Sequence, residues 1–248
     1  MSYTTKHSEL SSSLKTFDNQ LELNDNLIFN RKHWHYLICG KRGSGKTTLL
    51  LNLLTTPKKE GGLLKEFDKI YLVSSTALKD SKLDELVEEL QRGGTFYSDF
   101  SNDVMTEIME DMEKTTSLKK KTPHYLLILD DVISSLPKNT QKRQAYNKFL
   151  VSSRHYKSSM IVLTQRLNEL SPLVRSQSDI VSYYRSDNKK EDKIFTETFN
   201  VPEPMLKWCV SQPHSFITVS FTSGTPKYFC KFDEIEIKKS EDEKEEKD

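Results

Sequence analysis

The segment from Gly40 to Thr47 constrains the fold of this chain more than any other. It reads Gly-Lys-Arg-Gly-Ser-Gly-Lys-Thr, matches the pattern G-x-x-x-x-G-K-[ST], and contains three of the chain's 8 glycines. An apolar run, Trp34–Cys39, precedes it, and a helix-forming run, Thr48–Leu54, follows it. Glycines allow positive φ angles that turn successive N–H groups inward, and a helix N-terminus adds the positive end of its dipole. The segment therefore predicts a strand, a turn and a helix that together bind phosphate groups.

The residue types in this turn suit a nucleoside triphosphate. Lys46 is expected to reach the β- and γ-phosphates, and the Thr47 hydroxyl is expected to bind Mg²⁺. ATP and Mg²⁺ are the cofactors that this chemistry predicts. The alternative is a glycine-rich turn that binds nothing. The residues assigned to the nucleotide are Gly40, Lys41, Arg42, Gly43, Ser44, Gly45, Lys46, Thr47 and Thr48.

Two adjacent acids follow a second apolar run, Tyr125–Leu129. Side chains at the carboxyl end of a buried parallel strand project into the crevice where ligands bind. Asp130 and Asp131 would repel each other there unless a cation lay nearby. Asp130 is therefore the predicted Mg²⁺ partner, and Asp131 the carboxylate that orients the attacking water. In the alternative reading, Asp131 caps a helix at Val132–Leu136.

A third apolar run, Met160–Thr164, ends in an amide that could contact the γ-phosphate or the attacking water, Gln165. Arg154 closes a predicted helix, Gln141–Tyr156, just before this run. It could act on a neighbouring subunit's nucleotide as an arginine finger, or simply stabilise the helix C-terminus as a cation. Arg175 is a second candidate for the same role, against the alternative of a surface arginine.

Short apolar runs alternate with helical patterns along most of the chain. This alternation predicts an α/β fold with a mostly parallel sheet and helices on both faces. After residue 200, two runs around Ser223–Pro226 predict a β-hairpin added to the edge of that sheet. The strand predictions are Trp34–Cys39, Lys69–Ser74, Tyr125–Leu129, Met160–Thr164, Asp179–Tyr184, Phe216–Phe221 and Lys227–Phe232, and the helix predictions are Thr47–Leu54, Leu83–Arg92, Asp103–Lys114 and Gln141–Tyr156, with an apolar stripe from Leu78 to Leu90.

The composition divides the chain into one domain, 31–237, an irregular N-terminal arm, 1–30, with a short strand around Leu21–Leu27, and a charged tail, 238–248. The 37 Lys and Arg residues nearly balance the 36 Asp and Glu residues, so nucleic acid would have to bind a local patch or several assembled copies. No signal peptide and no apolar stretch of about 20 residues is visible, which predicts an intracellular protein that is not in a membrane. Three scattered cysteines without a C-x-x-C spacing predict reduced thiols.

The order and spacing of these motifs resemble the viral genome-packaging ATPases of the FtsK–HerA superfamily, the type found in poxviruses, giant viruses and virophages. The more specific signals are Arg154-His155 before a strand that ends in Thr-Gln, and the Pro-x-x-Arg-Ser of residues 172–176. The resemblance covers roughly residues 32–185. Cellular members usually have Asp-Glu where this chain has Asp130-Asp131, whereas viral packaging members carry Asp-Asp.

This resemblance implies a P-loop ATPase domain of the ASCE type that drives double-stranded DNA into a preformed capsid. It also implies a homo-oligomeric ring of five or six subunits, capsid or portal partners, and action where virions assemble. Gln165 would be the sensor and Arg154 the finger supplied in trans, with Arg175 as its substitute.

Two other classes of P-loop protein remain open. A switch GTPase would need Asn-Lys-x-Asp, and the nearest string, at residues 188–191, ends in Glu; a nucleotide kinase would need an arginine-rich lid, which is not evident. A scaffold that binds nucleotide without hydrolysing it is the other alternative.

Several side chains have competing readings. His33 and His35 would share one face of a strand, but two histidines alone do not make a metal site. Lys119–Lys121 could contact DNA phosphates or form a solvated loop, and the lysines of residues 189–193 could touch DNA but are mixed with acids. Trp208 is expected in the core.

Overall fold

The computed structural model describes residues 28–29, 31–57, 60, 62–132 and 144–235. The predicted strand at Leu21–Leu27, most of the predicted arm and the whole predicted tail lie outside these residues. Within the part of the chain that is described, no helix combines the length and the apolar character that crossing a bilayer would require.

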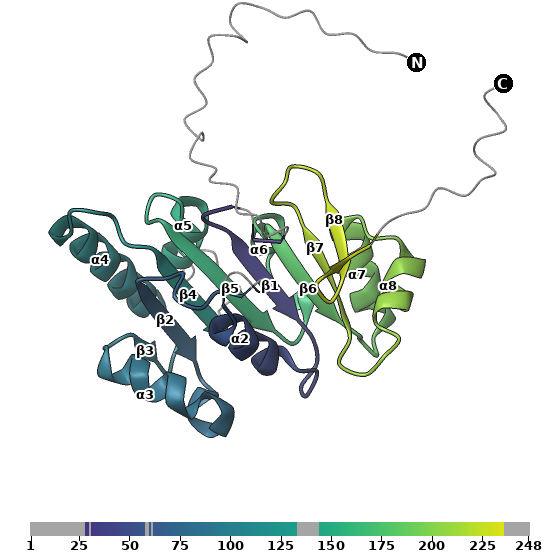
Figure 1. The fold of residues 1–248 in the computed structure, drawn as a ribbon, viewed down its shortest axis with the longest axis horizontal. Helices are drawn as coiled ribbons and strands as arrows, with labels where there is room; N and C mark the ends of the chain where they lie inside the picture. The colour runs from purple at the N-terminus through teal and green to yellow at the C-terminus, as the bar shows by residue number, and fades with distance from the viewer. Residues whose placement is uncertain (1–27, 30, 58–59, 61, 133–143, 236–248) are drawn as a thin grey trace, which may run out of the picture.

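Nine strands form one sheet, which is the centre of the molecule (Figure 1). Their order is β3-β2-β4-β5-β1-β6-β7-β8-β9, and every pairing from β3 to β6 is parallel. The strands are β1 (His35–Cys39), β2 (Lys69–Ser74), β3 (Phe96–Tyr97), β4 (Tyr125–Asp130), β5 (Ser158–Thr164), β6 (Ile180–Tyr184), β7 (Phe216–Ser220), β8 (Lys227–Cys230) and β9 (Asp233–Glu234).

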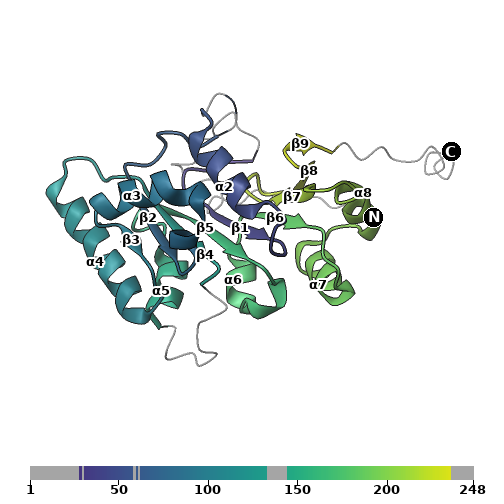
Figure 2. The same ribbon diagram turned by 90° about the horizontal axis from the view of Figure 1, so that it is seen from below.

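Helices cover both faces of the sheet (Figure 2). One apolar cluster joins α2 and α3 to one face, and a second joins the remaining α-helices to the other. The described helices are α2 (Lys46–Thr55), α3 (Asp84–Arg92), α4 (Asn102–Leu118), α5 (Gln144–Ser152), α6 (Pro172–Ser176), α7 (Lys189–Phe199) and α8 (Glu203–Cys209), with 3₁₀ turns η2 (Ala77–Lys79), η3 (Ser81–Leu83) and η6 (Leu167–Glu169).

The central strands are buried along their whole length because helices lie on both sides of them. Every residue of β1, β4, β5 and β6 is buried, which explains why these strands read as continuous apolar runs. Alternate side chains of β4 enter the two clusters, so that Leu126 and Ile128 face α2 while Leu127 and Leu129 face α4 and α5.

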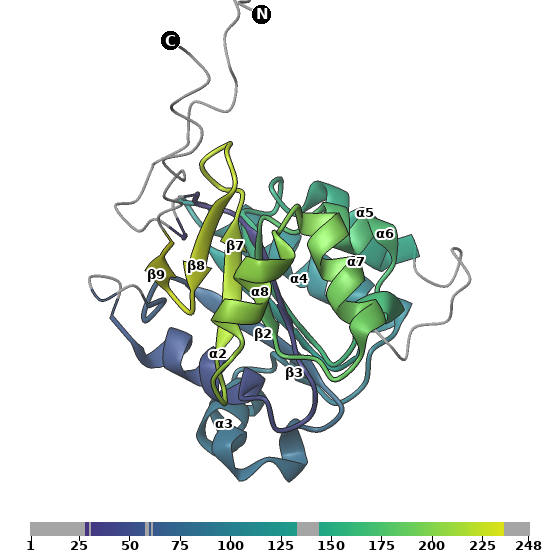
Figure 3. The ribbon, with the colours of Figure 1, turned by 90° about the vertical axis from the view of Figure 1, so that its right-hand side faces the viewer.

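The predicted hairpin is present and extends the sheet at one edge. β7 runs antiparallel to β6, with Ile180 opposite Ser220, and β8 runs antiparallel to β7. Figure 3 views the molecule from this edge, with α7 and α8 beside β7. The predicted α/β architecture, with a mostly parallel sheet and a C-terminal β addition, is therefore confirmed.

Two predictions need correction. The apolar stripe from Leu78 to Leu90 is not one helix: it contains two 3₁₀ turns before α3, because the Asp80 carboxylate accepts the Lys82 N–H and starts a new turn there. Trp208 is 62% exposed rather than in the core. Its neighbours on α8, Leu206 and Cys209, take the buried face, and Trp208 lies on the other side of that short helix.

Candidate active site

The glycine-rich turn between β1 and α2 depends on close backbone approach. Gly43 has a φ of 77° and Gly45 a φ of 108°, both in the region that favours glycine. A Cβ on Gly40 would lie 2.6 Å from Ser44 Oγ and 2.8 Å from Tyr184 Cβ. The turn is therefore compact enough to present its N–H groups at the start of α2.

Lys46 is buried at the first position of α2. Its Nζ donates to the carbonyl of Gly40 at 2.7 Å and to that of Lys41 at 3.4 Å, which holds the ammonium against the turn. Lys46 and Thr47 line a pocket of about 1110 Å³ at the carboxyl ends of the parallel strands, which we call the nucleotide pocket.

Asp130, the last residue of β4, is buried in the same pocket. Its Oδ2 accepts from Ser74 Oγ at 2.8 Å and from Thr76 Oγ1 at 3.4 Å. Ser74 lies beside Asp130 because β2 pairs with β4 in that register. Burial raises the pKa of the Asp130 carboxyl and the charge of Asp131 raises it further, while Ser74 and Lys46 oppose the shift.

Asp131 and Gln165 meet at the tips of adjacent strands. Gln165 Nε2 donates to Asp131 Oδ2 at 2.8 Å. Asp131 has a φ of 52°, and its N–H donates to the Leu163 carbonyl at 3.0 Å, so its backbone is tied to β5 in an unusual conformation. Because β5 lies between β4 and β1, Gln165 is placed between the acids and the glycine-rich turn.

The structure thus brings Lys46, Thr47, Asp130, Asp131 and Gln165 to one pocket, together with residues 42–45 and Thr48. Lys46 and Asp130 interact electrostatically, so the phosphate-binding and acidic motifs are not on opposite edges of the sheet. The reading of Asp131 as a helix cap concerns residues that lie mostly outside the described ones.

Sequence reasoning missed several residues of this pocket. Ser74 and Thr76 hold Asp130, and polar residues directly after a strand neighbouring the acids were the available signal. His214 was not predictable, because it comes from the turn before β7, far along the chain; its Nδ1 lies 3.1 Å from the Ser44 carbonyl.

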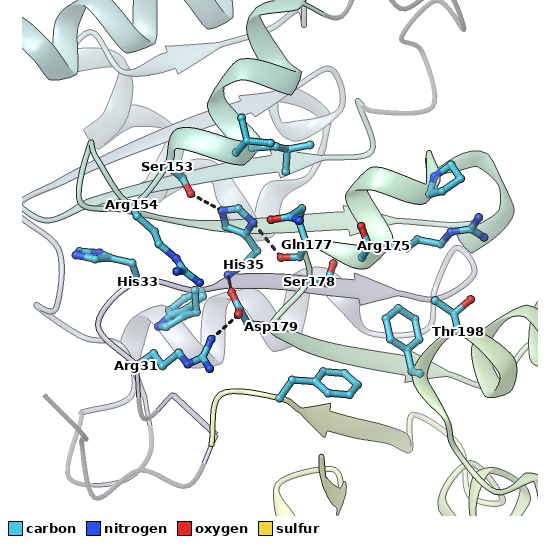
Figure 4. A pocket seen from close by; sticks show the side chains of 17 residues that line it. Arg31, His33, His35, Ser153, Arg154, Arg175, Gln177, Ser178, Asp179 and Thr198 are labelled. Atoms are coloured by element: carbon cyan, nitrogen blue, oxygen red, sulfur yellow. Dashed lines mark hydrogen bonds and ion pairs between the residues drawn. The ribbon is translucent and has the colours of Figure 1, made fainter. Parts of the chain in front are cut away.

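Arg154 and Arg175 lie elsewhere. They line a second pocket of about 750 Å³, the arginine pocket, at the amino ends of β1 and β6 (Figure 4). Five strand residues separate His35, in this pocket, from Gly40, a distance of roughly 16 Å at the usual rise. In Figure 4 Arg175 points away from Arg154. Neither arginine is placed to act on the nucleotide pocket of its own chain.

A buried histidine organises the arginine pocket. The ring of His35 is bonded to Ser153 Oγ at 2.8 Å and to the Gln177 carbonyl at 3.1 Å, and its backbone N–H donates to Asp179 at 3.0 Å. Asp179 also pairs with Arg31 at 3.1 Å. These contacts fix the segment just before Arg154, and they give His35 a structural partner set; the described residues contain no cluster of three potential metal ligands.

A second buried acid supports the segment after Gln165. Glu191 of α7 accepts the backbone N–H of Leu167 at 2.8 Å and that of Asn168 at 3.3 Å, and it is 4% exposed. Sequence reasoning treated Glu191 as part of a mixed charged surface, so this contact was missed. Glu191 anchors η6 and therefore the strand tip that carries Gln165.

Comparison with known proteins places this geometry among known folds. The family model described as Poxvirus A32 protein matches residues 23–197, more than half of the chain. No curated protein sequence matches significantly.

Solved structures with this fold include the DNA-packaging ATPase B204 from Sulfolobus Turreted Icosahedral Virus, with a TM-score of 0.58, 19% identity, and coverage of 79% of this chain and 96% of that one. They also include the genome packaging NTPase B204 from Sulfolobus turreted icosahedral virus 2 in complex with ATP-gammaS, with a TM-score of 0.56, 18% identity, and coverage of 80% and 97%. At this identity the likeness shows the fold, and it agrees with the fold class and the family resemblance expected from the motifs.

Proposed function

The chain belongs to the Poxvirus A32 protein family, and from this premise we propose that it is an ATP-hydrolysing motor that packages viral double-stranded DNA. The observation that carries the proposal is the convergence of Lys46, Asp130, Asp131 and Gln165 on one pocket beside a glycine-rich turn. The two solved structures with this fold are packaging enzymes by their own descriptions, which supports the same reading.

The pocket suits a nucleotide-bound magnesium ion. Mg²⁺ prefers oxygen ligands, and the side chains nearest the proposed position, those of Thr47 and Asp130, supply hydroxyl and carboxylate oxygens. Asp130 is buried beside a second carboxylate, a pair that a cation would stabilise. Thr47 and Asp130 would hold the ion, which would supply positive charge to the phosphate oxygens when bound.

The remaining chemistry belongs to the chain itself. The N–H groups of residues 43–47 bind the β- and γ-phosphates, and Lys46 stabilises the charge that develops on them. Asp131 orients a water for in-line attack on the γ-phosphate and accepts its proton. Gln165, bonded to Asp131, is the residue that responds when the γ-phosphate leaves, and η6 carries that change away from the site.

The second arginine-rich pocket gives the proposed ring a role. Because Arg154 and Arg175 lie at the far end of the sheet from their own nucleotide pocket, either could complete a catalytic site only in a neighbouring subunit. We place the finger on Arg154, whose neighbour Ser153 is fixed by His35. Five or six subunits would enclose DNA, and capsid or portal proteins would hold the ring where virions assemble.

The first test measures ATP hydrolysis with and without double-stranded DNA, for the wild-type chain and for Lys46→Ala. We expect DNA to stimulate wild-type turnover and Lys46→Ala to abolish it, because the ammonium no longer offsets transition-state charge. Lys207→Ala, an exposed lysine of α8 paired with Glu203, is the matched control and should retain activity.

Other outcomes would select other functions. Phosphorylation of an acceptor nucleotide would indicate a kinase, and ATP binding without turnover would indicate a scaffold. Wild-type turnover in Lys46→Ala would reject the assignment of the phosphate cradle.

A further inference from the structure

About half of the nucleotide pocket has no role in phosphate chemistry. Beyond the glycine-rich turn its wall is formed by β6, the turn before β7, β7, and the segment after β8. The residues that this wall contributes are Tyr184, His214, Phe216, Lys231 and Phe232.

The strand order fixes the direction in which a bound nucleotide must lie. In the proposed function the γ-phosphate faces Asp130 and Asp131, on the β4 and β5 side of β1. β6, β7 and β8 lie on the opposite side of β1 (Figure 1). A triphosphate that crosses the turn from β4 towards β6 therefore carries its ribose and base into the wall formed by the hairpin.

The chemistry of this wall suits a flat aromatic ring. Tyr184 and Phe216 pack with ring centroids 4.8 Å apart, and Phe216 contacts Phe232 edge to face at 5.6 Å. Tyr184 and Phe216 are buried, whereas Phe232 remains 39% exposed in the pocket. Phe232 is thus an aromatic ring that is held by packing on one side and open on the other.

The wall is also fastened to the phosphate cradle. His214 Nδ1 lies 3.1 Å from the carbonyl of Ser44, within the glycine-rich turn. His214 and Lys231 both have a φ of 57°, and the Lys231 N–H donates to the Phe216 carbonyl at 2.8 Å. Among the described residues, six non-glycine positions have positive φ, and Asp131, His214 and Lys231 are three of these that line this one pocket. Backbone strain of this kind concentrates where a ligand is bound.

We propose that the C-terminal hairpin forms the base-binding half of the ATP site, with Phe232 stacking on the purine and His214 and Lys231 at its polar edge. The inference rests on the proposed function, since the phosphate half sets the direction of the nucleotide. Base stacking on an aromatic side chain is tolerant of base identity, so this site would bind adenine and guanine nucleotides with similar affinity.

The test uses calorimetry on the full chain, with ATP and inorganic tripolyphosphate as separate probes. Phe232→Ala should weaken ATP binding about tenfold, because one stacking contact is lost, and should leave tripolyphosphate binding unchanged. KM for ATP should rise by a similar factor while kcat stays constant. Phe232→Tyr, which keeps the ring, should restore ATP binding, and Phe232→Leu, which keeps apolar volume only, should not.

Trp208→Ala is the matched control, because Trp208 is an exposed aromatic residue that does not line the pocket. Unchanged tripolyphosphate binding also reports that Phe232→Ala is folded. If wild type binds ATP and Phe232→Ala binds it equally well, the base site is overturned and the proposed function stands. If wild type binds neither probe, both are overturned.

Discussion

At the scale of single residues, the amino end of β1 concentrates histidines in a positively charged setting. Burial lowers the pKa of His33 to about 3, and the charges of His124, Lys32, Lys157 and Arg154 add to the shift. Burial also lowers the pKa of His35. These rings are therefore neutral in the folded protein at pH values where the unfolded chain binds protons.

The first residue-scale prediction is that stability falls on mild acidification. A histidine with a lowered folded pKa contributes stability that is complete above its unfolded pKa, about 6.5, and that is lost as the pH falls below it. Between pH 7.5 and 5, His33→Gln should lose less stability than wild type, by about 1 kcal/mol once the partial exposure of the ring is allowed for. Urea unfolding at both pH values measures this difference.

His155→Gln is the control, because His155 is exposed and lies only two residues after Ser153. It should show the wild-type dependence on pH. An equal loss of stability in wild type and His33→Gln would mean that His33 does not titrate as its burial requires.

At the scale of elements, the sequence predicted best those segments whose burial is uniform. β2 occupies the predicted range, Lys69–Ser74, and the other central strands differ from prediction by only a few residues, because a strand covered on both faces is a continuous apolar run. β3 and β9, of two residues each, carry no pattern to detect. Helix α7 was missed for a different reason: its buried positions are Phe195, Phe199 and Glu191, and the acid interrupts the apolar stripe.

The candidate site divides in the same way. Residues at the tips of predicted strands, such as Asp130 and Gln165, could be found because parallel strands gather their carboxyl ends at one edge. The positions of Arg154 and Arg175 at the opposite edge came only from the structure. Phe232 and His214 reach the pocket through antiparallel pairing of β7 with β6, which no local pattern specifies.

The element-scale prediction concerns the contact between α7 and the end of β5. Glu191→Ala removes a buried acceptor from two backbone N–H groups, so the free energy of unfolding should fall by about 2–3 kcal/mol. Because these N–H groups follow Gln165 closely, kcat for ATP hydrolysis should fall as well. Glu191→Gln keeps one acceptor and should lose less of both. Denaturant unfolding and steady-state kinetics measure the two effects.

Glu197→Ala tests whether any loss of a carboxylate on α7 has this effect. Its ion pair with Lys193 is exposed, so its removal should change stability by less than about 0.5 kcal/mol and leave kcat unchanged. A loss of stability in Glu191→Ala with unaltered kcat would show that the segment after Gln165 moves without consequence for hydrolysis.

At the scale of the whole molecule, the sheet separates two pockets of opposite chemistry. The nucleotide pocket, with its acids and phosphate cradle, lies at the carboxyl ends of the parallel strands, and the arginine pocket lies at their amino ends. A chain built in this way can present its arginines to the nucleotide of another copy by head-to-tail contact. Head-to-tail contacts close into rings when the rotation between subunits permits it. The proposed ring and the proposed trans-acting finger therefore stand or fall together.

Mixing two inactive chains tests this arrangement directly. Lys46→Ala keeps Arg154 but has no working phosphate cradle, and Arg154→Ala keeps the cradle but lacks the finger. In randomly mixed rings, roughly a quarter of the interfaces join an intact cradle to an intact finger, so an equal mixture should regain part of the DNA-stimulated ATPase activity. Arg154→Ala mixed with the double variant K46A/R154A offers no such interface and should stay inactive. If the first mixture also stays inactive while light scattering shows intact mixed assemblies, the finger is not Arg154, and the same pairing with Arg175→Ala then decides whether the second arginine of the pocket supplies it.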